Sequence, residues 1–261
     1  MRLSIDVALN YHFDQPADVL LAVEAAQLPD QKLIEDRLVV EGVGPLRAVD
    51  GEDGIGRRTW MCAEGDFRAR YRAEIEVDRR PISISELPIT PRRELPAQVI
   101  PYLWPSRYCQ ADRFEAFVER EFPGANHGAK ILAMSRWIHE RVDYCPGASD
   151  ATTTAVDIFV SRQGVCRDFA HLLASFARAA GVPARLASAY AWDLDPPDFH
   201  AVVEIWLAGD WYLVDPTELA PLDGLARIAI GRDATDVAFM TIFGRADLIE
   251  QRVEVRRIDV P

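Results

Sequence analysis

The sequence lacks the features of a membrane or secreted protein. It has no uninterrupted run of about eighteen apolar residues, so it predicts no membrane-spanning helix. Its first residues, MRLSIDVALNYH, alternate like a strand and show neither the apolar run nor the small-residue cleavage site of a secretory signal. We therefore expect a cytoplasmic protein that does not bind membranes.

Basic residues and cysteines are also scarce. The chain has 29 Lys and Arg against 41 Asp and Glu, which disfavours nucleic-acid binding because phosphate recognition needs a basic surface. Its four cysteines show neither CxxC pairs nor the Cys and His spacing of a zinc site. In a chain of this length without a secretory signal we expect reduced thiols, one of which could be catalytic. They are Cys62, Cys109, Cys145 and Cys166.

The first 90 residues indicate a β-rich domain. Apolar and polar residues alternate with period two at 2–13 and 67–78, and more loosely at 31–42. The turn signals FDQP, GVGP and DGEDGIG separate these runs, so we predict an antiparallel, sandwich-like domain. A connector rich in proline follows. Its prolines are Pro81, Pro88, Pro91, Pro96, Pro101 and Pro105.

After residue 100 the apolar period becomes helical. The pattern predicts amphipathic helices within 112–122 and 127–144, a short helix near 154–162, and a longer helix over 166–180 that ends at Gly181. These helices mark a second domain. We therefore divide the chain into a β-rich domain with its linker, and a core. The expected bounds are 1–100 for the first and 101–261 for the second.

Strands return in the last part of the chain. Three strand-like runs follow the helices, at 184–192, 200–208 and 211–216. One more is expected at about 251–259, and it could join either domain. Helices and antiparallel strands in separate runs predict an α+β fold class.

Cys166 stands at the expected N-terminus of the 166–180 helix, where cysteine is an unusual choice. The unpaired N–H groups and the dipole of a helix N-terminus favour an anion, so a thiol placed there is favoured as a thiolate. The same N–H groups could hold a developing oxyanion. The alternative is a small buried cysteine with no chemical role.

A thiolate nucleophile also needs a base. Of the five histidines, His200 begins a strand directly after the polar, proline-bearing loop DLDPPDF, a position that favours a cleft. Asp215 ends the next strand and lies roughly opposite His200 if the two strands form a hairpin across the Gly-Asp pair. A carboxylate there would orient the imidazole, although an Asp before Pro216 could simply cap a turn. His171 is interpreted as structural, and the remaining histidines, His12, His127 and His139, as surface or interface residues.

The order Cys, His, Asp resembles the papain-like arrangement. The segments GVCRDFAHLLASFARAAGVPARLASAY and HAVVEIWLAGDWYLVDPTE resemble the core of the bacterial transglutaminase-like superfamily, with its pattern GxCxDxA, then G-[IV]-P-A-R, then HAW-x-E and DPT. The first 90 residues look like the β-rich domain that commonly precedes this core. The resemblance implies a helix with the cysteine packed on an antiparallel sheet, without a metal, calcium or other cofactor. It implies Cys166 as nucleophile, His200 as base and Asp215 as the orienting residue.

Other residues are candidates for the cleft. Gln163 could supply an oxyanion donor, although the backbone N–H of Cys166 is the simpler choice. Arg167 could favour the thiolate or be a solvated side chain. Asp168 is interpreted as structural, at the positive end of the helix. Aromatic candidates for the cleft walls, each with core packing as the alternative, are Trp137, Tyr144, Tyr190, Trp192 and Trp206.

These observations predict a cysteine enzyme that transfers acyl groups from amide bonds of peptides or proteins through a thioester. With water as acceptor, the favoured case, it would be a protease or amidase. With an amine it would be a protein-glutamine transglutaminase. A non-catalytic scaffold is a second hypothesis, which the intact set of three residues argues against. A redox protein, with Cys145 approaching Cys166, is a third.

Overall fold

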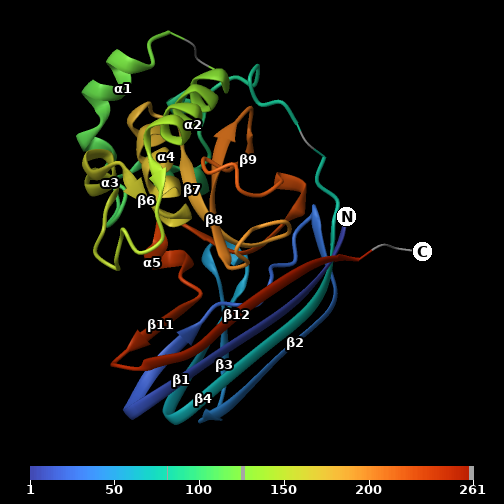
Figure 1. Ribbon diagram of the computed structural model, residues 1–261. Helices are drawn as coiled ribbons and strands as arrows, with labels where there is room; N and C mark the ends of the chain where they lie inside the picture. Colours follow the sequence, from blue (N-terminus) through green and yellow to red (C-terminus); the bar gives the residue numbers. More distant parts are fainter. Residues whose placement is uncertain (81, 125–126, 259–261) are drawn as a thin grey trace.

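The computed structural model describes residues 1–80, 82–124 and 127–258 (Figure 1). The helices are α1 Glu115–Glu121, α2 Ala129–Arg141, α3 Ala155–Ser161, α4 Cys166–Ala179 and α5 Ala234–Val237. The strands are β1 Arg2–Leu21, β2 Gln31–Val43, β3 Arg47–Asp50, β4 Arg57–Val77, β5 Asp143–Tyr144, β6 Gln163–Gly164, β7 Ala184–Ala191, β8 Phe199–Leu207, β9 Asp210–Val214, β10 Leu225–Gly231, β11 Met240–Phe243 and β12 Asp247–Ile258. The predicted α+β class is confirmed. None of the described helices is long and apolar enough to cross a membrane.

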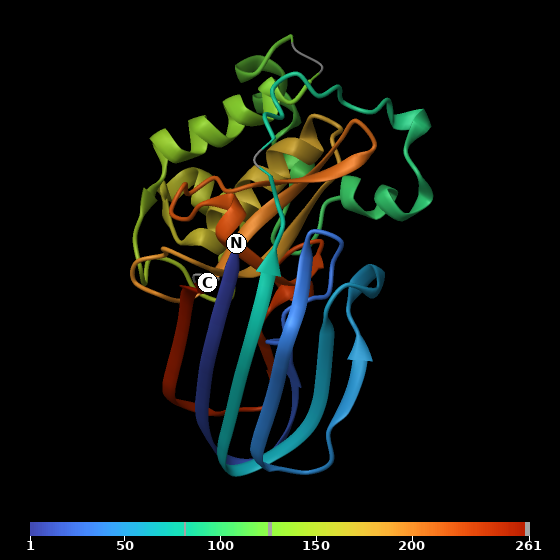
Figure 2. The same cartoon turned by 90° about the vertical axis from the view of Figure 1, so that its right-hand side faces the viewer.

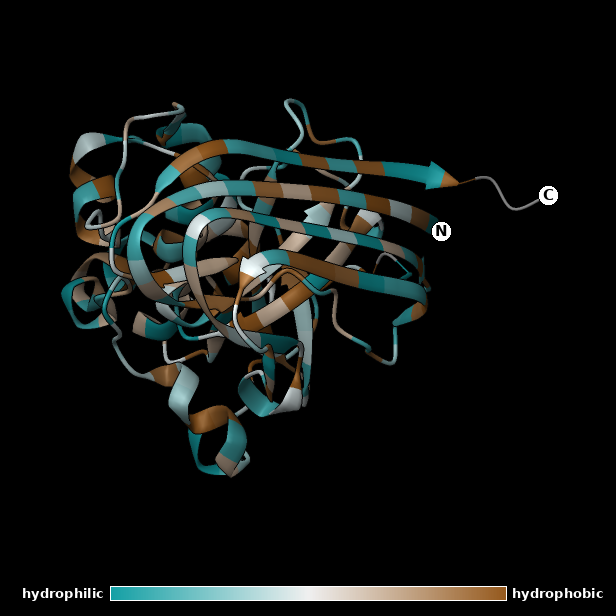
Figure 3. Ribbon diagram, turned by 90° about the horizontal axis from the view of Figure 1, so that it is seen from below, coloured by the Kyte–Doolittle hydropathy of each residue, from teal (hydrophilic) through white to brown (hydrophobic). Residues whose placement is uncertain are grey.

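The long strands β1 and β4 form the centre of the N-terminal sheet. They pair antiparallel from Arg2 opposite Glu76 to Leu21 opposite Thr59. Hydrophobic and hydrophilic residues alternate along the long strands (Figure 3), which gives the sheet one apolar face. The predicted turn at FDQP is wrong, because these residues form a bulge inside β1, where the register shifts between Phe13 and Ala17. A bulge tolerates proline, which cannot donate to the strand ladder.

The N-terminal part is a single six-stranded sheet and not a sandwich of its own. Its apolar face packs instead against residues of the core, including Tyr190, Ala226 and Ile228. The C-terminal strands complete this sheet: β11 and β12 both pair with β1, as Figure 2 shows for the red strand beside the dark blue one. The expected C-terminal strand therefore returns to the first domain. Position 259 at its predicted end, like Pro81 in the linker, lies outside the described residues.

The core is a four-stranded antiparallel sheet in the order β10-β7-β8-β9, with α4 packed on one face. The predicted helices α1, α2, α3 and α4 are confirmed, as are β7, β8 and β9. Strand β10, between β9 and α5 in sequence, was not predicted. Gly181 ends α4 with a φ of +78°, and its N–H donates to Arg178 O. A side chain at this position would also collide with the Arg92 guanidinium from the linker.

Candidate active site

The N-terminus of α4 presents Cys166 to solvent. Val165 is the N-cap residue in extended conformation, and Cys166 is the first residue of the helix. Because the first N–H groups of a helix have no acceptor within the helix, the partly exposed thiol lies at the positive end of a dipole. The predicted placement of Cys166 at a helix N-terminus is thus confirmed.

His200 and Asp215 form a buried pair. His200 Nε2 lies 2.8 Å from Asp215 Oδ2, and the two residues are only 2% and 7% exposed. The other carboxylate oxygen, Oδ1, accepts hydrogen bonds from the N–H and hydroxyl of Thr217 at 2.9 and 2.7 Å. Both interpretations of Asp215 therefore hold. It closes the turn after β9, and this contact fixes the carboxylate that orients the imidazole.

The hairpin register differs slightly from the prediction. Strands β8 and β9 pair with Val203 opposite Val214, so the turn falls at Ala208 and Gly209, both with positive φ, one residue before the expected Gly-Asp turn. Asp215 is therefore level with Val202 and diagonal to His200. Diagonal neighbours on one face of a sheet remain within reach of side chains as long as these.

The second ring nitrogen of His200 faces the thiol. Its Nδ1 is buried and makes no hydrogen bond of good geometry among the described residues. Burial lowers the pKa of His200, but hydrogen bonding to Asp215 and the nearby Cys166 thiol together raise that pKa to about 10. Since Asp215 holds Nε2, Nδ1 is the atom left to exchange a proton with Cys166. The structure thus brings the three predicted residues together.

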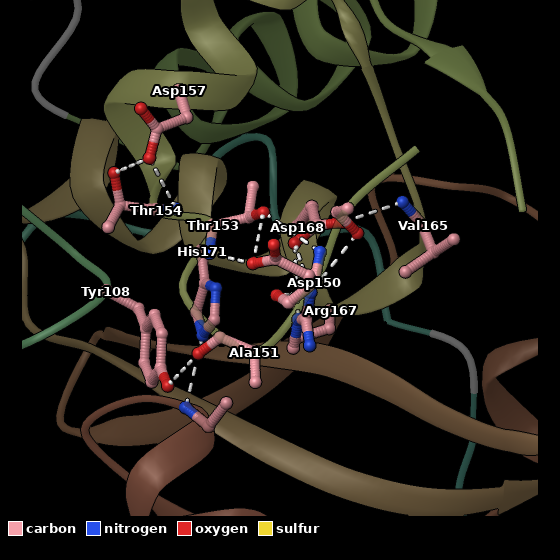
Figure 4. A network of polar contacts seen from close by, with 12 residues as sticks. Tyr108, Asp150, Ala151, Thr153, Thr154, Asp157, Val165, Arg167, Asp168 and His171 are labelled. Atoms are coloured by element: carbon pink, nitrogen blue, oxygen red, sulfur yellow. Dashed lines mark hydrogen bonds and ion pairs between the residues drawn. The ribbon is translucent and has the colours of Figure 1, made fainter. Parts of the chain in front are cut away.

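A polar network holds the first turn of α4 in place (Figure 4). Asp168 is fully buried, and its carboxylate accepts hydrogen bonds from the Val165 N–H at 2.9 Å and from the Ser149 hydroxyl. Arg167 donates to Asp168 and, at 2.9 Å, to the backbone oxygen of Asp150. The guanidinium therefore compensates the negative charge of Asp168 near the thiol. Asp168 is structural, as predicted, and Arg167 is its ion-pair partner, a role that neither of its two interpretations included.

His171 belongs to the same region but has no chemical part in the site. Its Nε2 accepts a hydrogen bond from the Ala234 N–H at 3.1 Å, and its ring stacks on Tyr108 with centroids 5.1 Å apart (Figure 4). Burial lowers the pKa of His171 to about 3, so the ring is neutral. Its interpretation as structural agrees with these contacts.

The aromatic candidates separate into two groups. Tyr144 lies beside the site, because β5 pairs parallel with β6 and aligns Tyr144 with Gly164. Gln163, also a candidate, precedes Gly164 on β6 with an exposed side chain. Trp137 instead stacks on Phe159 at 5.8 Å in the helical core.

The remaining aromatic candidates each make packing contacts. Tyr190 is fully buried and donates to the backbone oxygen of Val23 in the other domain. Trp192 packs against Gly224. Trp206 contacts Trp211 near the turn of the hairpin. This is the far end of β8 from His200. For Tyr190 and Trp137 the cleft prediction is wrong, because apolar packing between layers uses the same residue types as a binding cleft.

The segment before β8 contacts the N-terminal sheet. Asp198 in this segment accepts a hydrogen bond from Gln251 Nε2 of β12 at 2.7 Å. The contact fixes the segment to the N-terminal sheet. Cys166 remains partly exposed, so the thiol stays accessible to solvent.

A second buried ionic cluster lies further along β8. Glu204 is fully buried and accepts hydrogen bonds from Arg185, at 2.6 Å, and from Arg227. Arg227 also pairs with Asp30, and Arg185 with Asp53. A cavity of about 670 Å³ borders this cluster, and among the described residues its lining includes neither Cys166, His200 nor Asp215. No group of three or more His, Cys, Asp or Glu side chains in the described ranges is arranged to hold a metal ion.

Comparisons with known proteins point to one family. The family model of the transglutaminase-like superfamily matches residues 116–216, which include Cys166, His200 and Asp215. The crystal structure of a proposed cysteine protease from Cytophaga hutchinsonii aligns with a TM-score of 0.93 at 34% identity, over 100% of this chain and 92% of that chain. The alignment therefore includes the N-terminal sheet as well as the core.

Two curated sequences are similar over part of their length. The uncharacterized protein ML0607 of Mycobacterium leprae is 31% identical over 150 residues, 52% of each chain. A protein-glutamine gamma-glutamyltransferase of Pseudomonas aeruginosa is 35% identical over 102 residues, which are 34% of this chain and 15% of that protein. The aligned region is thus about half of the first relative and a small part of the second.

Proposed function

This chain belongs to the transglutaminase-like superfamily, and from that membership we propose that it is a cysteine-dependent enzyme that transfers acyl groups from amide bonds of peptides or proteins. The observation that carries the proposal is the geometry of His200. Asp215 holds Nε2 at 2.8 Å, while Nδ1 is buried and makes no hydrogen bond of good geometry within residues 1–80, 82–124 and 127–258, and the ring interacts with the Cys166 thiol. Such an imidazole is prepared to take a proton from the thiol and to return it.

The proposed reaction has two steps. His200 Nδ1 takes the thiol proton, Cys166 Sγ bonds to the carbonyl carbon, and the oxyanion that forms is stabilised by N–H groups of the first turn of α4. The carbon–nitrogen bond then breaks as the imidazolium gives its proton to the departing amine, which leaves a thioester on Cys166. Asp215 stabilises the imidazolium throughout. An acceptor, activated by the neutral imidazole, releases the acyl group.

We propose water as that acceptor, because the thiol is partly exposed to solvent and the similar Cytophaga hutchinsonii structure carries a cysteine-protease name. The alternative is an amine, as in the transglutaminase reaction, which the name of the Pseudomonas relative supports. A thioester formed from p-nitrophenyl acetate tests the two. In the hydrolytic case added lysine or cadaverine leaves the turnover rate unchanged, whereas an amine acceptor increases turnover and yields the acetylated amine.

The proposal is tested by the rate of iodoacetamide alkylation at each cysteine against pH, read by mass spectrometry. We expect Cys166 to react at least about tenfold faster than Cys62 near pH 6, because a thiolate–imidazolium pair exposes a nucleophile there. His200→Ala removes the advantage. Cys62 is the exposed control. Cys109 is the unreactive control, because burial raises the pKa of its thiol to about 11.

The opposite outcome is equally clear. If Cys166 reacts no faster than Cys62 and Cys145 at any pH, the three residues do not act as a unit. The scaffold hypothesis would then take first place. Cys166→Ala provides the blank for both experiments, and its thermal midpoint is expected to stay within a few degrees of wild type, since the side chain is partly exposed.

A further inference from the structure

The two-residue strand β5 places Tyr144 beside the nucleophile. It pairs parallel with β6, and the Cys145 N–H donates to Gly164 O at 2.9 Å. Gly164 lies two residues before Cys166, so this backbone contact fixes the position of Tyr144 relative to the first turn of α4. The ring also packs against Phe169 of that turn, with centroids 5.9 Å apart.

The Tyr144 hydroxyl lies near both groups that would face a reacting carbonyl. It interacts with the thiol of Cys166 and with the backbone N–H of the same residue. Burial, followed by the charge of the Cys166 thiolate, raises the pKa of Tyr144 to about 12. The hydroxyl therefore keeps its proton and can act as a hydrogen-bond donor at neutral pH. The residue is 40% exposed, so substrate can reach it.

The acyl oxygen of a bound substrate must come close to these same groups. When Sγ of Cys166 bonds to the carbonyl carbon of the substrate, the acyl oxygen is still bonded to that carbon. The acyl oxygen therefore lies close to any hydrogen-bond donor that contacts both Sγ and the backbone N–H of Cys166. A backbone N–H alone supplies one hydrogen bond to the oxyanion. Tyr144 brings a neutral O–H group within reach of Cys166.

We propose that the Tyr144 hydroxyl donates a hydrogen bond to the acyl oxygen and, with the backbone N–H of Cys166, forms the oxyanion hole. The inference rests on the proposed acyl-transfer function. As the carbon–sulfur bond forms, the carbonyl electrons move to oxygen, and the tyrosine keeps its proton while hydrogen-bonding to that oxygen. When the leaving group departs with a proton from His200, the electrons return and the hydrogen bond weakens.

Two probes of Cys166 distinguish this role from others. Iodoacetamide reacts at a saturated carbon without forming an oxyanion, whereas p-nitrophenyl acetate acylates the thiol through an oxyanion and releases p-nitrophenolate. Tyr144→Phe removes only the hydroxyl and keeps the ring on Phe169. We expect alkylation of Cys166 within twofold of wild type and acylation slower by about 100-fold, the usual effect of losing one oxyanion donor. Tyr212→Phe, in β9, is the matched control and leaves both rates unchanged.

Each other outcome overturns the proposal in a recognisable way. Unchanged acylation in Tyr144→Phe removes any role for the hydroxyl. An increase in both rates shows that the hydroxyl shields the thiol, and an equal decrease in both shows that it positions Cys166 or His200. The wild-type protein tests the proposed acyl-transfer function separately from the role of Tyr144. If its Cys166 is neither rapidly alkylated nor acylated, the proposed function itself fails, and this inference fails with it. An unchanged thermal midpoint and an intact alkylation rate show that the variant is folded.

Discussion

Two buried ionic clusters lie on one face of β8, since Glu204 follows His200 by four positions and side chains two or four positions apart share a face of a strand. At Glu204 both carboxylate oxygens are paired with arginines, and these arginines reach further carboxylates. At His200 one ring nitrogen is paired with Asp215, and the other has no hydrogen bond of good geometry in the part of the chain that the structure describes. The hydrogen bonds of the buried polar group are thus all made at Glu204, whereas at His200 one of the two ring nitrogens is left without one among the described residues.

We propose that this difference separates a cluster that takes part in the reaction, at His200, from one that supports the fold, at Glu204. A group whose hydrogen bonds are all made gains nothing from a substrate, and removing one partner leaves a buried charge uncompensated. A ring nitrogen that has no other hydrogen-bond partner and lies next to a partly exposed thiol can exchange a proton with that thiol. Glu204 holds the N-terminal sheet to the core through Arg227 and Asp30, whereas His200 is available for chemistry.

The largest effect is expected at the His200–Asp215 pair, and it is an effect on the reaction rate. Asp215→Ala removes the group that holds His200 Nε2, and we expect acylation of Cys166 by p-nitrophenyl acetate to fall by about 1,000-fold. The pKa of His200, now about 10, should move toward or below its ordinary value, because burial remains and the carboxylate is gone. Titration of the imidazole by NMR measures this shift directly. Asp215→Asn is the isosteric comparison: its single amide oxygen can accept from Thr217 or from the ring but not from both, so it should keep the turn after β9 and still lose about as much activity as Asp215→Ala.

The same pair also links stability to pH. A raised pKa in the folded state stabilises the protein below the ordinary pKa of histidine, about 6.5, and this contribution is lost as pH rises through about 10. The free energy of unfolding of the wild type should therefore fall across this window more steeply than that of Asp215→Ala. Equal slopes would mean that Asp215 does not hold the imidazolium.

A smaller effect, on stability alone, is expected at the cluster of Glu204. Glu204→Gln leaves Arg185 and Arg227 without their shared buried carboxylate, and we expect the free energy of unfolding to fall by about 3 kcal/mol. Urea unfolding measures this, with Glu119→Gln on the exposed side of α1 as the control. Alkylation of Cys166 in the folded variant should match wild type. A stable variant with a slow Cys166 would reverse the assignment of the two clusters.

Sequence patterns predicted the helix of Cys166 and the hairpin of His200 and Asp215 because each depends on local signals. Periodicity and the terminating Gly181 define α4, and strand ends before Pro216 define the hairpin. The neighbours of the site depend instead on contacts between distant segments. Tyr144 reaches Cys166 through a parallel pairing of only two residues, which leaves no periodic signal, so its contact with the thiol could not be distinguished from the core packing of Trp137.

The fold of the N-terminal domain shows the same limit. Alternation predicted the strands but not that FDQP lies in a bulge, because a bulge and a turn use the same residues. Strand β10 and the return of β12 to β1 depend on tertiary packing. The sandwich expectation failed because the second layer over the apolar face is supplied by the core itself.

A third cluster of arginines around a carboxylate lies on the exposed face of the N-terminal sheet. Asp6, on the charged face of the N-terminal sheet, pairs with Arg70, Arg72 and Arg252 at 2.7, 2.9 and 3.0 Å, one more arginine than Glu204 has. Partial burial raises the pKa of Asp6, but hydrogen bonds from Arg70 and Arg72 outweigh it and hold the pKa below its usual value. Its stabilisation is therefore present at neutral pH and is lost as pH falls through that lowered pKa.

We expect the smallest effect here, because solvent and salt weaken exposed ion pairs regardless of how many partners they have. Asp6→Asn should lower the free energy of unfolding by less than about 1 kcal/mol at neutral pH, and less still in high salt. Urea unfolding at low and high ionic strength, beside Glu204→Gln, measures both. A loss as large as that of Glu204→Gln would show that the number of arginine partners, and not burial, decides what a carboxylate contributes. The clusters of His200 and Glu204 would then differ only in that the Nδ1 atom of His200 lacks a hydrogen-bond partner among the described residues.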